Sequence, residues 1–187
     1  AKLLIKLKIV LSMDAEKKNK WSVIINIALT TLTAILSALG FNAESFRLSV
    51  ITLLYDTMNK LTENFTLEEM ERSSVAAARG IDNHAPHCAV SNLQRLCQSV
   101  LQPLRDWYGA PVIVTSGYRS RMVNSLVGGS SRSYHVLGRA ADIVPVETIG
   151  RGAILRSWYL YIKDHLPYRE LLLESGKDGG EWIHVAM

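Results

Sequence analysis

Hydrophobic positions between Ser91 and Gly109 recur at intervals of three and four residues, which is the spacing of one face of an α-helix. The apolar residues on this face are Leu93, Leu96, Cys97, Val100, Leu101, Leu104 and Trp107. Glycine lacks a Cβ and readily adopts the left-handed conformation that ends helices, so Gly109 is expected to end this one. The pattern therefore predicts an amphipathic helix packed on the core of the protein.

Four short apolar runs predict strands over residues 111–116, 140–144, 169–174 and 182–186. A further helix is predicted over residues 147–166, weakened by Gly150 and Gly152, and residues 66–69 have the form of a capping box that opens a short helix. The polar stretch over residues 117–133 is assigned no helix or strand. Together, these elements predict an α+β fold in which a small, mainly antiparallel sheet packs against helices.

The first 60 residues have a different pattern, so we expect two parts, residues 1–60 and a compact domain over residues 61–187. No charged residue occurs over residues 21–40, and Lys17, Lys18 and Lys20 precede them. A helix of this length spans about 30 Å, the thickness of a hydrocarbon core. A hydrophobic N-terminal helix is therefore predicted, and its flanking lysines would place the second part on the periplasmic side of the inner membrane.

Two other interpretations of residues 1–60 remain open. Polar residues within the apolar stretch make membrane insertion marginal, and the small residues over 37–40 would suit the end of a cleaved signal peptide. Residues 13–40 also resemble the short hydrophobic smalltalk proteins of Bacteroides, in which case residues 1–60 are a fused reading frame and Met58 is the natural start. Membrane contact through residues 21–40 is expected only if the segment is a genuine anchor.

The charge balance argues against a nucleic-acid partner. Residues 1–60 contain eight of the 21 Lys and Arg residues and four of the 17 Asp and Glu residues, so residues 61–187 are electrically balanced. A nucleic-acid groove would concentrate positive charge in the folded domain. Cys88 and Cys97 form no disulfide framework and lack the close spacing of a thiolate zinc site, and Cys97 is expected in the core.

Three polar residues lie where the strand pattern would place packing residues. His135 follows the polar stretch, Asp142 lies within an apolar run, and His184 interrupts the last predicted strand. Each alone could be a hydrogen-bonded core residue, but a buried carboxylate is costly unless it is paired or bound to a metal. Two imidazoles and one carboxylate are the ligands of a catalytic zinc site, whose fourth position is left to water. The sequence therefore predicts one Zn²⁺ held by these three residues.

Two further residues are predicted to act beside this metal. Glu181 lies three residues before His184 and could take a proton from the attacking water and pass it to the leaving amine. Because residues three apart on a strand face opposite sides, Glu181 is expected on the preceding turn rather than in the strand. Arg119 is expected to bind a substrate carboxylate or to stabilise the oxyanion formed during the reaction.

Taken together, these motifs resemble those of the M15 metallopeptidases, which include D-alanyl-D-alanine carboxypeptidases, D,D-dipeptidases and phage endolysins. The resemblance is carried by SYHVLGRAAD over residues 133–142, by EWIH over residues 181–184 and by SGYRS over residues 116–120, in the family's order. It covers residues 61–187 and implies the zinc ligands His135, Asp142 and His184. The resemblance further implies Glu181 as the base and a substrate contact at Arg119, with Ser133 and Tyr134 flanking the first ligand and contacting the substrate.

The resemblance implies a fold like that of the D,D-peptidases and hedgehog proteins, and zinc-dependent hydrolysis of peptide bonds in peptidoglycan stem peptides. Both a D,D-carboxypeptidase and an endopeptidase of the endolysin type remain open. The alternative function is a non-catalytic, zinc-stabilised cell-wall-binding domain, because hedgehog proteins retain the metal site without peptidase function. We expect a monomer, and a cytoplasmic phage or prophage lysis protein if residues 1–60 are not a genuine anchor.

Overall fold

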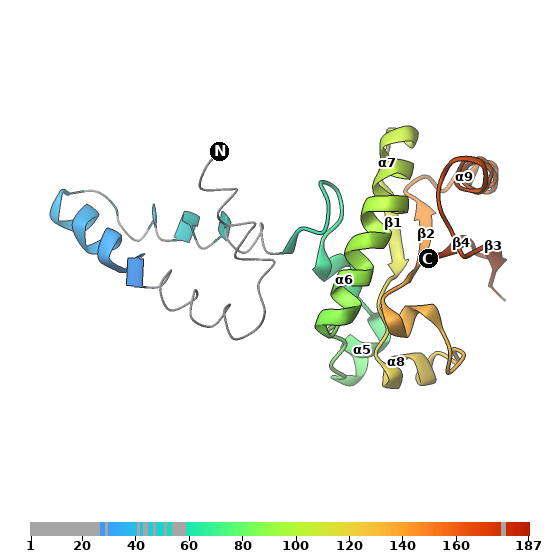
Figure 1. The fold of residues 1–187 in the computed structure, drawn as a ribbon, viewed down its shortest axis with the longest axis horizontal. Helices are drawn as coiled ribbons and strands as arrows, with labels where there is room; N and C mark the ends of the chain where they lie inside the picture. Colours follow the sequence, from blue (N-terminus) through green and yellow to red (C-terminus); the bar gives the residue numbers. More distant parts are fainter. Residues whose placement is uncertain are drawn as a thin grey trace. The chain divides into compact units, whose positions relative to one another are not determined.

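The computed structural model describes residues 59–176 and 179–187, together with residues 27–28, 30–40, 42, 45–46, 48–50 and 52–53 of the preceding segment. The chain divides into two compact units, Ala1–Met58 and Asn59–Met187, which are drawn in Figure 1. The second unit contains all the residues predicted to form the site.

The predicted hydrophobic N-terminal helix is not supported. Residues 30–38 are helical, but no helix within the described residues has the length and apolar character that crossing a membrane requires. Residues 21–26 and 29 of the predicted span lie outside the described residues.

A four-stranded antiparallel sheet forms the centre of the second unit, as the sequence predicts. Its strands are β1 (Val112–Ser116), β2 (Ala140–Pro145), β3 (Glu170–Ser175) and β4 (Glu181–Ala186), in the order β1-β2-β4-β3. Asp142 of β2 lies opposite His184 of β4, and it also lies opposite Ser116 of β1, beside an irregularity in that pairing. The two middle strands therefore place two of the predicted ligands side by side.

The predicted amphipathic helix is present and is longer than expected. It runs as α6 (His87–Leu96), a π-helical turn η1 (Cys97–Leu101) and α7 (Gln102–Tyr108), and it ends at Gly109 in the left-handed conformation. All of its predicted core residues except Trp107 are fully buried, including Cys97, whose pKa is raised to about 12 by burial. Trp107 is 48% exposed and stacks on Tyr161 with ring centroids 4.0 Å apart.

A single hydrophobic core joins these helices to α9 (Arg151–His165) and to one face of the sheet. Trp158 and Ile162 of α9 lie in this core with Ile183 and Val185 of β4. Because successive residues of a strand point to opposite faces, His184 must point away from the helices. The same alternation turns Asp142 away from the core. The sheet thus has one face for packing and one face for polar side chains.

Four shorter helical segments complete the unit: α4 (Leu67–Glu71), α5 (Ser74–Arg79), α8 (Arg121–Leu126) and the 3₁₀ turn η2 (Tyr134–Leu137). The Thr66 hydroxyl accepts a hydrogen bond from the Glu69 amide at 3.2 Å, so the predicted helix start is confirmed. Helix α8 lies within the stretch that was assigned no structure, and the hydroxyl of Ser120 caps it. Gly150 does not interrupt α9 but immediately precedes it, with φ 72°.

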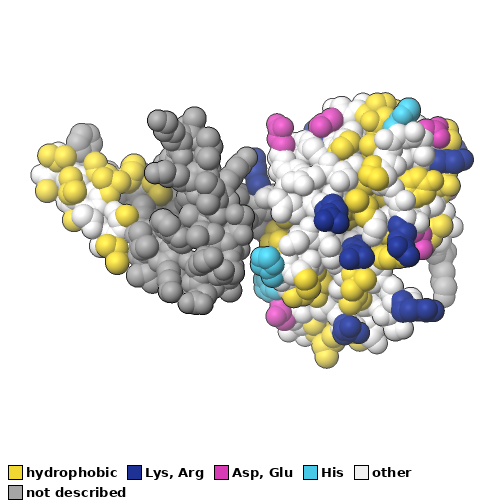
Figure 2. All heavy atoms as spheres, viewed as in Figure 1, with side chains coloured by type: hydrophobic (Ala, Val, Ile, Leu, Met, Phe, Trp, Pro, Cys, Tyr) yellow, Lys and Arg dark blue, Asp and Glu magenta, His cyan; other side chains and the backbone are white. Residues whose placement is uncertain are grey.

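Figure 2 shows one face of the molecule, on which Lys and Arg side chains of the second unit are separated by hydrophobic and uncharged atoms.

Gly138 provides a test of the close packing beside the site. It ends η2 with φ 67°, and a Cβ there would lie 2.5 Å from the Ala89 carbonyl oxygen. We expect Gly138→Ala to lower the free energy of unfolding by more than the roughly 1–2 kcal/mol that the left-handed conformation alone costs. Urea denaturation followed by circular dichroism measures this loss.

The control is Gly109→Ala, because Gly109 has φ 75° and nothing within 4 Å of its added Cβ. The Gly109→Ala variant should lose only the roughly 1–2 kcal/mol of unfolding free energy that the left-handed backbone conformation costs. Equal losses in the two variants would contradict the packing explanation for Gly138.

Candidate metal centre

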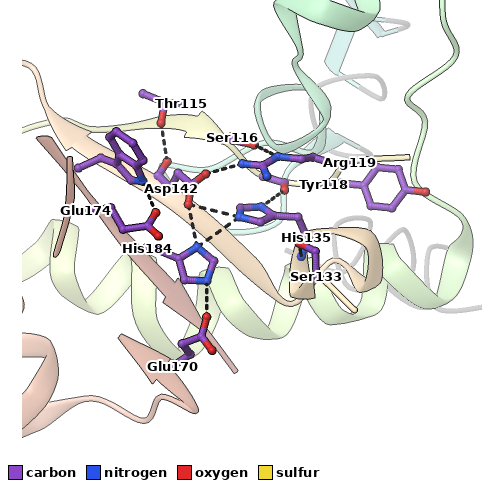
Figure 3. Close-up of polar contacts among 12 residues, drawn as sticks. Thr115, Ser116, Tyr118, Arg119, Ser133, His135, Asp142, Glu170, Glu174 and His184 are labelled. Atoms are coloured by element: carbon purple, nitrogen blue, oxygen red, sulfur yellow. Dashed lines mark hydrogen bonds and ion pairs between the residues drawn. The ribbon is translucent and has the colours of Figure 1, made fainter. Parts of the chain in front are cut away.

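Three side chains from separate segments meet on the open face of the sheet (Figure 3). His135 comes from η2, Asp142 from the middle of β2 and His184 from β4, and all three are buried. His135 Nε2 lies 3.3 Å from His184 Nδ1 and 3.3 Å from Asp142 Oδ1. His184 Nδ1 and Asp142 Oδ1 are 2.8 Å apart. Three potential ligand atoms therefore face a common point.

This arrangement fits one zinc ion. Ligands at about 2.0–2.2 Å from a tetrahedral zinc lie roughly 3.3–3.6 Å from one another. The three observed separations range from 2.8 to 3.3 Å, so a small outward movement of the closest pair would reach that geometry. Within residues 59–176 and 179–187, these three form the only group of His, Cys, Asp and Glu side chains arranged to hold a metal ion.

Hydrogen bonds outside the cluster orient both imidazole rings. His135 Nδ1 lies 2.7 Å from the carbonyl oxygen of Gly117, which can only accept, so Nδ1 carries the proton and Nε2 offers its lone pair. His184 Nε2 lies 3.2 Å from Glu170 Oε1, and this carboxylate can accept the Nε2 proton. His184 Nδ1 is then left to act as a ligand. Such outer contacts are what a metal site needs to hold its rings in place.

Arg119 holds the carboxylate of Asp142 from the other side. Its Nη2 donates to Asp142 Oδ2 at 2.5 Å, and its Nε donates to Ser116 Oγ at 2.7 Å. Burial raises the pKa of Asp142, but the contacts of its carboxylate with His135 and His184 and the charge of Arg119 lower it more. The pKa of Asp142 therefore lies well below its ordinary value, and the side chain remains an anion with Oδ1 turned to the cluster.

The surroundings of His184 are negatively charged. Burial lowers the pKa of this histidine, but the hydrogen bond to Asp142 and the charges of Asp142, Glu174 and Glu170 raise it, and the net shift is upward. The three carboxylates stabilise positive charge at this imidazole. They therefore favour a metal cation bound to the ring nitrogen in place of the proton.

The cluster lines a groove with a volume of about 560 Å³. Arg119, Ser133 and Tyr134, which the sequence predicts as substrate contacts, line the same groove. The Ser133 hydroxyl accepts a hydrogen bond from the His135 amide at 3.3 Å, and the Arg169 guanidinium lies 5.9 Å from the centre of the Tyr134 ring. The structure thus brings these residues to the cluster, and their roles toward a substrate stay predictions.

Glu181 is not among the residues that line this groove. The expectation that it lies on a turn is wrong, because β4 begins at Glu181 and its pairing with β3 extends to Ser175. Strand alternation therefore turns Glu181 to the face opposite His184. Its Oε2 lies 2.9 Å from the position that a Cβ on Gly152 of α9 would occupy.

Two carboxylates that the sequence analysis did not single out line the groove instead. They are Glu170 and Glu174, both on β3. Glu174 lies opposite Trp182 in the sheet and accepts a hydrogen bond from the indole nitrogen at 2.8 Å, and Figure 3 shows its carboxylate directed toward His184 and Asp142. Leu172 lies opposite His184 in the sheet, so strand alternation places residues 170 and 174 on the same face as His184. The sequence carries no clear signal of this, because three consecutive leucines over residues 171–173 show no alternation.

A family model described as peptidase M15 matches residues 63–158, just over half of the 187-residue chain. The matched segment contains Arg119, His135 and Asp142 and ends before His184. No curated protein matches the chain.

Metal binding is the direct test of the cluster. After removal of metals with a chelator, we expect the full chain to bind one Zn²⁺, measured by isothermal titration calorimetry. His184→Ala should abolish tight binding, because it removes one of the three ligands. Glu170→Ala should weaken binding by about 10–100-fold, the usual effect of removing a group that orients a ligand.

Glu181→Gln is the matched control, because Glu181 lies outside the groove. The zinc affinity of this variant should equal that of the unmodified chain. Circular dichroism of each metal-free variant separates loss of binding from loss of folding. Unchanged zinc binding by a folded His184→Ala variant would contradict the assignment.

Proposed function

The chain belongs to the peptidase M15 family, and we propose that it is a zinc-dependent peptidase that hydrolyses stem peptides of bacterial cell-wall peptidoglycan. The observation that carries the proposal is the convergence of His135, Asp142 and His184 in a groove large enough to hold a peptide segment. The motifs of the D-alanyl-D-alanine carboxypeptidases and endolysins support a cell-wall substrate.

A zinc ion in this cluster would supply Lewis acidity, which lowers the pKa of water and polarises a peptide carbonyl. The protein's own residues would do the rest of the chemistry. Arg119 keeps Asp142 ionised and oriented through its hydrogen bond to Oδ2. Glu170 and the Gly117 carbonyl hold the two imidazole rings in place. These contacts pre-organise the groove before the substrate arrives.

Proton transfer needs a base that faces the substrate, and Glu174 has the better position for it. Its carboxylate lines the groove and is held by the Trp182 indole, whereas Glu181 lies against α9. A carboxylate at this place can accept a proton from the attacking water and then donate it to the leaving amine. We therefore assign the base to Glu174 in place of Glu181.

One observation favours the alternative of a zinc-stabilised cell-wall-binding domain without turnover. The glutamate of the EWIH motif, which the family resemblance implies as the base, does not line the groove. If Glu174 does not replace it in proton transfer, the domain would bind wall peptides without cleaving them. Hydrolysis assays separate these two functions.

Digestion of purified sacculi tests the proposed reaction. Incubation with the full chain should release peptide fragments, and their masses identify the scissile bond and so distinguish carboxypeptidase from endopeptidase. A chelator should abolish the release, and added Zn²⁺ should restore it. Equal release with and without the chelator would reject the zinc mechanism. Sedimentation of the protein with sacculi without any release would support the binding domain.

Two substitutions identify the base. Glu174→Gln keeps the shape of the side chain but cannot accept the proton, so kcat should fall by about 10²–10⁴-fold while zinc affinity is retained. Glu181→Gln should leave kcat unchanged. Steady-state kinetics on the released peptide bond, with zinc titration of each variant, measures both effects. The reverse pattern would return the role of base to Glu181.

A further inference from the structure

The groove that contains the metal cluster has a second part that the proposed reaction does not use. It is lined by residues that precede and begin α5 and by residues that follow α8. Helices α5 and α8 contact each other, away from strands β3 and β4 (Figure 1). This part of the groove, which we call the arginine end, contains Arg72, Ser73, Ser74, Ser130 and Arg132.

Charge is divided between the two parts of the groove. The carboxylates among the lining residues, Asp142, Glu170 and Glu174, all belong to strands β2 and β3. The arginine end contributes two arginines and three serines to the lining and no carboxylate. A ligand that lies along the groove would therefore meet a cation-binding cluster at one point and an anion-binding surface at another.

Both arginines of this end are available to a ligand. They are exposed, and neither guanidinium forms a hydrogen bond or ion pair with a partner in the described part of the chain. Burial raises the pKa of Glu69 and the charge of Arg72 opposes that rise, yet the two side chains form no ion pair. Arg119, by contrast, is held by Asp142 and Ser116 and has less capacity to bind a substrate carboxylate.

We propose that Arg72 and Arg132 form a subsite that binds a carboxylate of the peptide substrate, at a distance from the scissile bond. Guanidinium groups bind carboxylates through paired hydrogen bonds, and the serine hydroxyls beside them can donate further ones. The carboxylate is supplied either by an acidic side chain or by the C-terminus of the peptide. This inference rests on the proposed peptidase function and adds the charge of the substrate to it.

Binding measurements separate this subsite from the chemistry. The full chain carrying Glu174→Gln, loaded with zinc, is titrated with one synthetic wall-type peptide in three forms. One form keeps its acidic side chain and has an amidated C-terminus, one has an amidated side chain and a free C-terminus, and one is amidated at both positions. We expect at least one carboxylate form to bind about tenfold more tightly than the fully amidated form. The form that does so identifies the source of the carboxylate.

The double substitution Arg72→Ala and Arg132→Ala should abolish this preference and leave the affinity for the fully amidated peptide unchanged. Arg79→Ala is the matched control, because Arg79 is an exposed arginine of α5 that does not line the groove. It should retain the preference. In the otherwise unmodified enzyme, the double variant should raise KM for the preferred peptide by a similar factor without changing kcat.

Three results would overturn the subsite. These are equal affinity for all three forms, a preference that survives the double substitution, and an equal loss of affinity for all three forms. Failure of the proposed function looks different, because the unmodified chain would then cleave none of the peptides while the binding preference and its loss in the double variant persisted.

Discussion

The ionised carboxylate of Asp142, buried on a central strand of the sheet, is the constraint on which the site depends. Removing a carboxylate from water costs several kcal/mol unless charges and hydrogen bonds compensate. Arg119 provides that compensation at Oδ2, and a cation held between Oδ1 and the two imidazoles would provide it at Oδ1. Each partner is itself held, by Ser116, by the Gly117 carbonyl and by Glu170. A single buried charge therefore determines the orientation of the residues around it.

The two-residue period of the strands separates stability from chemistry. On β4, Ile183 and Val185 lie in the core while His184 points to the groove. The same strand therefore packs the core with one face and places a polar side chain in the groove with the other. The helical face needs only shape and apolar character. The open face carries polar side chains whose burial is tolerated because they bond to one another. Substitutions on the two faces should therefore affect different properties of the protein.

Much of this arrangement could be predicted from the sequence, since the periodicity around Leu93 and the apolar runs identify the main helix and all four strands. Strand alternation and the cost of a buried charge identified Asp142 and its two histidine neighbours. The role of Glu181 was inferred from its spacing to His184 and from the EWIH motif, but the length of the β3–β4 turn decides which way that residue faces. Glu174 was missed because its importance depends on strand pairing, and α8 because its capping serine lies in a stretch without apolar periodicity.

Strand β3 is paired on one side only, since it lies at the edge of the sheet. Edge strands fray more readily than central ones, because their outer backbone groups bond to solvent. Glu170 and Glu174 both belong to this edge, whereas the candidate ligands Asp142 and His184 lie on strands with a neighbour on each side. Local opening of β3 would consequently release Glu170 from His184 and displace Glu174, the proposed base, in one event. The proposed metal binding and proton transfer would thus both depend on the opening free energy of a single strand, which hydrogen exchange can follow residue by residue.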